Sequence, residues 1–129
     1  MSYGTSVTVH RPFDETVEAT RAALAEQGFG ILTEIDVQAT LKAKLDHDMA
    51  PYLILGACNP PLAKRGLEAE ESLGLLLPCN VVVRAAGDDT VVEALDPQTM
   101  VRLTDNEALT PVADEAARRL ADVLAELGR

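Results

Sequence analysis

Apolar and polar positions change their spacing along this chain, and the changes predict a succession of strands and helices. Residues 3–9 alternate polar with apolar side chains, the period of a half-buried strand. Residues 13–27 instead repeat their larger apolar side chains at a helical period, and Gly28 is a favourable residue to follow a helix. Alternation returns over residues 29–35, which predicts a second strand with Phe29, Ile31 and Ile35 on one face.

The pattern continues with shorter elements. A helix over 37–45 can be capped by Asp36, and a polar loop over 46–51 follows it. Residues 52–57 form a continuous apolar run, which is typical of a strand buried on both faces. The segment 59–61, Asn-Pro-Pro, favours a helix start, so a helix over 62–71 and a strand over 75–84 are predicted next. A turn at 86–89, a strand over 90–95, a short helical turn to Met100 and a helix from 110 to 127 complete the chain.

This order, βαβαβαββα, predicts an α+β fold. We expect an antiparallel or mixed sheet of about five strands with helices packed mainly on one face. The turn at 86–89 is too short to carry a parallel crossover, so the two strands beside it must be antiparallel. The chain has 129 residues and shows neither an internal repeat nor a linker, so residues 1–129 are predicted to be a single domain.

Composition narrows the range of partners. The chain carries 11 basic and 21 acidic residues, a formal charge of −10, which repels phosphate backbones and argues against nucleic-acid binding. No apolar run approaches the ~20 residues that span a bilayer, and no signal peptide is visible, so no membrane partner is expected. Two cysteines do not make a disulfide framework, which favours a cytoplasmic location.

Two Cys-Asn pairs, Cys58-Asn59 and Cys79-Asn80, are the main candidate functional residues of the chain. Cys58 directly precedes a predicted helix start, where unpaired N–H groups and the helix dipole favour a thiolate. Gly56 shares its strand face and lets another group approach the backbone. Cys79 follows a proline, which cannot donate to a sheet and therefore predicts an edge strand or a bulge. We accordingly expect Cys58 to be the more reactive thiol.

Three functions are compatible with these residues. The first is a small binding protein whose ligand lies near Gly56, Cys58, Asn59, Cys79 and Asn80, the ligand being a small apolar molecule, a sulfur species or a soft metal bound by Cys58 and Cys79. The second is a structural or interaction module in which both cysteines are packing residues. The third is an enzyme that uses Cys58 or Cys79 as a nucleophile or as a redox thiol. Since neither histidine lies in a recognisable triad segment, no catalytic residue and no cofactor are assigned.

The chain also resembles a known family. The matching residues are 28–36, 39–44, 55–60, Ala63, 76–81 and 96–97, and they include both Cys-Asn pairs. In these segments the chain is similar to the domain-of-unknown-function 302 family, which comprises uncharacterised small α+β domains of bacteria and archaea. The resemblance implies a homodimer. It supplies no reaction, because none is assigned to the family.

Overall fold

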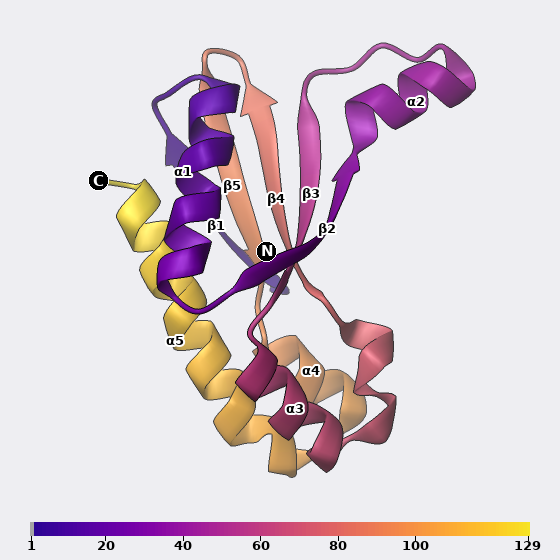
Figure 1. Ribbon diagram of the computed structural model, residues 1–129, viewed down its shortest axis with the longest axis vertical. Helices are drawn as coiled ribbons and strands as arrows, with labels where there is room; N and C mark the ends of the chain where they lie inside the picture. Colours follow the sequence, from indigo (N-terminus) through magenta and orange to yellow (C-terminus); the bar gives the residue numbers. More distant parts are fainter. Residues whose placement is uncertain (1) are drawn as a thin grey trace.

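A single five-stranded sheet organises the molecule. The computed structural model describes residues 2–129, and within them the strands run in the order β1-β5-β4-β3-β2 with every neighbouring pair antiparallel (Figure 1). The elements are β1 (Gly4–Val9), α1 (Phe13–Glu26), β2 (Gly30–Asp36), α2 (Val37–Leu45), β3 (Tyr52–Cys58), α3 (Pro60–Ala69), the 3₁₀ helix η1 (Glu71–Leu76), β4 (Cys79–Ala86), β5 (Asp89–Leu95), α4 (Gln98–Thr104), the 3₁₀ helix η2 (Glu107–Leu109) and α5 (Thr110–Leu127). The predicted fold class and element order are confirmed.

Helices α1 and α5 cover one face of the sheet (Figure 1). Their apolar stripes pack on the strand residues that alternate toward them, and the resulting core is almost wholly aliphatic. Leu24 from α1, Val123 from α5 and Leu55, Val81 and Val92 from the central strands are among its most deeply buried members. Burial of aliphatic surface is therefore the main force that holds these two layers together.

Within residues 2–129, no helix covers the opposite face of the sheet (Figure 1). Tyr52, Ile54 and Val82 point to this open face and are half-buried, whereas Leu55 and Val81, which alternate to the other side, are fully buried. The prediction of a strand buried on both faces over 52–57 is thus wrong, because the helices pack on one face only. An Arg84–Glu93 ion pair, 2.8 Å long, bridges β4 and β5 on the open face.

Helices α3 and α4 lie beyond one end of the sheet, beside the first turns of α5 (Figure 1). A smaller cluster of Leu73, Met100 and Leu109 fills the space between η1, α4 and η2. The prediction of a strand from residue 75 is wrong here, since residues 71–76 form η1 and the strand begins at Cys79. An apolar Leu-rich run satisfies either element, and the tertiary packing of Leu73 selects the helix.

Two predictions about strand geometry are corrected. Pro78 does not mark an edge strand or a bulge in β4, because β4 lies between β3 and β5 and begins one residue later. A proline is tolerated there because it precedes the ladder. The irregularity in the sheet lies instead in β2, between Ile31 and Thr33. It places Ile31 opposite Ala57 and Ile35 opposite Ile54, on different faces, so the expected alternation of β2 fails.

Helix α2 projects from the end of the sheet that is remote from α3 and α4 (Figure 1). None of its nine residues is buried. Asp36 caps it as predicted by accepting a hydrogen bond from the Ala39 N–H at 2.9 Å. Throughout residues 2–129, no helix combines the length and the apolar character needed to cross a membrane.

Candidate functional site

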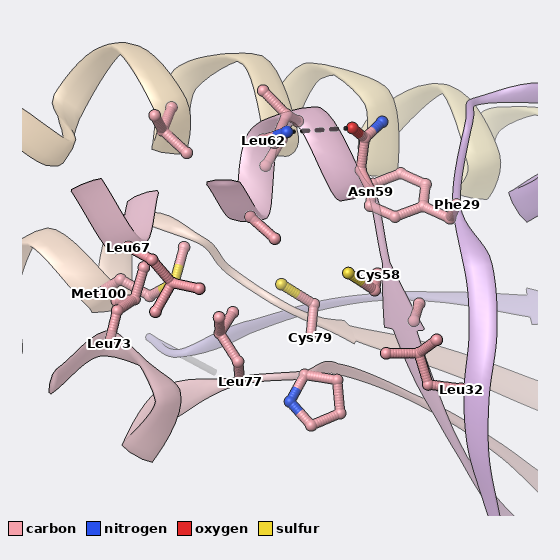
Figure 2. A pocket seen from close by; sticks show the side chains of 15 residues that line it. Phe29, Leu32, Cys58, Asn59, Leu62, Leu67, Leu73, Leu77, Cys79 and Met100 are labelled. Atoms are coloured by element: carbon pink, nitrogen blue, oxygen red, sulfur yellow. Dashed lines mark hydrogen bonds between the residues drawn. The ribbon is translucent and has the colours of Figure 1, made fainter. Parts of the chain in front are cut away.

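A cavity of about 320 Å³ opens between the end of the sheet and the helices beyond it (Figure 2). Its size is at the lower end of the range for small-molecule sites, roughly 300–1,000 Å³. Leu32 and Leu67, two of its lining residues, are largely exposed at 67% and 42%. The side chains that line it are Phe29, Leu32, Ala57, Cys58, Asn59, Leu62, Ala63, Leu67, Leu73, Leu77, Pro78, Cys79, Met100, Val112 and Ala116.

Both cysteines line this cavity, and neither is in a disulfide. Cys58 is the last residue of β3 and Cys79 the first residue of β4. Figure 2 shows the two side chains beside one another, with both sulfur atoms pointing in the same direction rather than at each other. Cys79 is buried, with 8% of its surface exposed, whereas Cys58 is only half-buried. The structure thus brings together the two residues that the sequence singled out as candidate soft-metal ligands.

The two thiols have different surroundings. Burial among apolar side chains raises the pKa of Cys79 to about 11, and the negative charge of a Cys58 thiolate adds to the effect. Cys79 is therefore a neutral thiol at physiological pH. The more exposed Cys58 is the thiol that a reagent from solution meets first.

Asn59 fixes the start of α3 at the wall of the cavity. Its side-chain Oδ1 accepts a hydrogen bond from the Leu62 N–H, which is the N-cap arrangement predicted from the sequence. The Ala63 N–H bonds to the Asn59 carbonyl, and the two residues between are prolines without an N–H. The expectation of unpaired N–H groups beside Cys58 is therefore wrong, because Asn59 accepts hydrogen bonds from the first two N–H groups of α3.

The other end of the Asn59 amide joins α3 to α1 and α5. Its Nδ2 donates to the Gln27 carbonyl at 3.5 Å, and Arg119 Nη1 donates to the same oxygen at 2.8 Å. The backbone bends away at Gly28, where φ is +83°, and a Cβ there would lie 3.0 Å from Asn59 Nδ2. Because both ends of the amide already have partners, Asn59 serves to hold the cavity wall in place.

Gly56 and Asn80 do not line the cavity. Gly56 lies in β3 on the open face of the sheet, and the group that approaches it is the chain itself: Thr33 Oγ1 touches the Cβ position and Pro78 Cγ lies 2.8 Å from it. Asn80 is exposed in β4 and borders a shallow depression on the open face, next to Tyr3 and Tyr52. A ligand-binding role for these two residues stays a prediction.

Most of the cavity wall escaped the sequence analysis. Leu62 and Leu67 come from α3, Leu73 from η1, Met100 from α4 and Val112 from α5. Each fits the apolar stripe of its own element, so nothing in the sequence separates it from an ordinary core residue. The high exposure of Leu32 and Leu67 is a sign of an unfilled apolar surface, and it is visible only in the structure.

The lining residues, all within the described part of the chain, include no acidic, basic or histidine side chain. His10 bonds Asp89 at 3.0 Å elsewhere on the surface, and His47 is exposed in the loop after α2. Among residues 2–129 no three His, Cys, Asp or Glu side chains are grouped as metal ligands. A cysteine nucleophile in this cavity would consequently lack a neighbouring side-chain base.

The fold and cavity can now be set beside known proteins. A family model described as a domain of unknown function, DUF302, matches residues 5–127. The chain belongs to the DUF302 family. The crystal structure of an uncharacterized conserved DUF302 protein from Bacillus stearothermophilus is similar to it, with 30% sequence identity, a TM-score of 0.91 and 98% of each chain covered. No protein with curated annotation matches the chain. The resemblance drawn from the Cys-Asn segments is thus confirmed, and this DUF302 fold extends over nearly the whole chain.

Proposed function

We propose that this protein binds a small apolar molecule in the cavity between β3, β4 and helices α3, α4 and α5. The observation that supports the proposal is the chemistry of the wall, which is formed mostly by aliphatic side chains, with the Phe29 ring, two thiols, one thioether and the Asn59 amide, and has no charged group. Binding of an apolar molecule to such a wall is favourable, because it removes apolar surface from water. Leu32 and Leu67 extend the same apolar surface to the solvent, where a ligand can enter.

An uncharged apolar fluorophore, N-phenylnaphthylamine, provides the test. Its emission should rise on binding to the wild-type protein. Ala63 is half-buried on the cavity wall, so Ala63→Leu should fill part of the space and weaken probe binding by about tenfold or more. Ala25→Leu adds the same atoms at an exposed position of α1 and should leave binding unchanged. Equal probe affinity in the two variants would place the probe outside the cavity and refute the proposal.

We also propose that the open face of the sheet is covered by a second copy of the chain. Tyr52, Ile54 and Val82 form an apolar surface there, and Ile35 beside them is 49% exposed. A contiguous apolar surface of this kind is unusual on a monomer. It offers the homodimer implied by the family resemblance a place to form, and it leaves the cavity mouth at the end of the sheet accessible.

Light scattering at micromolar concentration measures this association. The wild type should give twice the 13.8 kDa mass of one chain, and Ile54→Lys should give the single mass, because a buried lysine without a partner opposes association. Ala25→Lys places the same charge on α1 and should remain dimeric. A wild-type protein of 13.8 kDa would remove the proposal. Two free thiols also suit a reducing compartment, and we place the protein in the cytoplasm on that basis.

A further inference from the structure

The sulfur atoms of Cys58 and Cys79 form a pair in surroundings that are otherwise apolar. They come from adjacent strands, lie beside one another with both sulfurs pointing the same way, and line one cavity (Figure 2). A pair of buried thiols can be a packing contact, but here one of them is half-exposed and both border open space. Because both thiols border open space, a ligand can reach them, whereas it cannot reach two thiols enclosed in a packing contact.

We propose that Cys58 and Cys79 bind one Cu(I) ion as a two-coordinate bis-thiolate site. Thiolate sulfur is a soft ligand and selects soft metals, of which monovalent copper is the physiological example. The proposal goes beyond the binding of an apolar molecule in the same cavity and does not depend on it.

The ligand count favours copper over zinc. Structural Zn²⁺ sites use four ligands in a tetrahedron, and the cavity provides two thiols with no histidine or carboxylate among its lining residues. The described residues also hold no group of three or more such side chains elsewhere. Cu(I) is stable with two thiolates in a line, so the pair completes its coordination without a third ligand. The aliphatic wall keeps water and other hard donors away from the ion.

Charge and proton balance are consistent with a cation at this position. Binding converts two thiols and one Cu⁺ into a bis-thiolate complex of charge −1 and releases two protons, with no change of oxidation state. The positive end of the α3 dipole begins at Asn59, next to Cys58, and offsets part of the remaining charge. The net charge of −10 attracts cations over a longer range.

Anaerobic titration of the reduced protein with Cu(I), in competition with bicinchoninate, tests the site. The wild type should bind one equivalent, with affinity that rises with pH because protons are released. Cys58→Ser and Cys79→Ser should each lose this binding. Ala63→Ser adds a hydroxyl to the same cavity and keeps both sulfurs, so it should bind like the wild type. Undiminished Cu(I) affinity in either cysteine variant would overturn the proposal.

A second measurement uses the wild type alone and does not depend on the folding of any variant. X-ray absorption of the Cu(I)-loaded protein should show two sulfur scatterers and no nitrogen or oxygen in the first shell. A shell containing nitrogen or oxygen would refute the bis-thiolate site. N-phenylnaphthylamine binding to the metal-free cysteine variants separates the two proposals: its persistence beside lost Cu(I) binding supports a thiol-specific site. If a cysteine variant lost both Cu(I) binding and N-phenylnaphthylamine binding while Ala63→Ser kept both, the cavity of the cysteine variant would have collapsed. The loss of copper binding could then not be assigned to the missing sulfur, and the proposal would be overturned.

Discussion

Cys58 and Cys79 line the same cavity although they are not cross-strand partners. Ala57 lies opposite Cys79 in the β3–β4 ladder, and Cys58 pairs with Gly30 on the other side. Strict alternation would place the two thiols on opposite faces of the sheet. Both thiols nevertheless reach the same cavity, because β3 ends at Cys58 and the chain turns directly into α3. This turn directs the last side chain of the strand into the cavity. The start of α3 therefore determines the geometry of the thiol pair.

Alkylation should distinguish the two thiols. Cys58 is half-exposed, whereas burial holds the pKa of Cys79 at about 11 and so keeps it neutral and protected. Brief exposure of the native protein to iodoacetamide at neutral pH should label Cys58 first, as mass spectrometry of the peptides would show. In Cys58→Ser, labelling of Cys79 should require partial unfolding or strongly alkaline pH. Faster labelling of Cys79 than of Cys58 in the wild type would contradict this order.

Stability at alkaline pH should depend on Cys79. Its pKa is raised from 9.0 to about 11 by folding, so the folded state favours the protonated thiol. This contribution is complete below pH 9 and is lost as the pH rises toward 11, a change of about 2–3 kcal/mol for a difference of that size. Denaturant unfolding of the wild type and Cys79→Ala, under reducing conditions, should show a stability difference that shrinks across this interval. A constant difference from pH 8 to pH 11 would contradict the assignment.

An added methyl group at Gly56 should destabilise the fold. A Cβ there would touch Thr33 Oγ1 and lie 2.8 Å from Pro78 Cγ, so β2 or the start of β4 must shift. Overpacking of this kind costs about 1–3 kcal/mol, which chemical denaturation of Gly56→Ala would measure. Gly74→Ala is the matched control, because nothing lies within 4 Å of its Cβ position. Equal free energies of unfolding in the two variants would contradict this prediction, because β2 and the start of β4 would then accommodate the methyl group without loss of stability.

Loss of the Asn59 side chain should cost more than loss of an exposed cap. Asn59→Ala removes the acceptor of the Leu62 N–H and the donor to Gln27, in a buried position, and should lower the free energy of unfolding by about 1–2 kcal/mol. Asn59→Ser retains an accepting oxygen and should lose less. Asp36→Ala removes the exposed cap of α2 and should lie at the low end, near about 0.5 kcal/mol. If Asn59→Ala and Asp36→Ala lowered the free energy of unfolding equally, burial and the second hydrogen bond of Asn59 would add nothing to its effect as a cap.

The fold could be predicted from local patterns because most elements carry their own boundary signals. The helix that ends before Gly28, the cap at Asn59 and the short turn before Asp89 all appear where the residues indicate. The failures occur where tertiary contacts decide between equally apolar alternatives. Leu75 and Leu76 fit a strand or a helix, and the packing of η1 selects the helix. The bulge after Ile31 leaves no mark in an alternating sequence.

The candidate site was predictable in part. Cys58, Asn59 and Cys79 stand out by residue type, and the structure places all three at one cavity. Gly56 stood out for the same reason, yet the space above it belongs to Thr33 and Pro78. The cavity itself depends on how α3, η1 and α4 leave room between them beyond the sheet. A cavity results from how the folded elements pack against one another, so no single residue in the sequence predicts it.

Helix α2 buries none of its residues and lies at the end of the sheet remote from the cavity. Since almost no apolar burial opposes its opening, its backbone amides should exchange with solvent far sooner than those of the central strands. The loop that follows it, around residues 46–50, is consequently a permissive position for an inserted peptide or reporter. A label placed there would leave the walls around the two thiols unaltered.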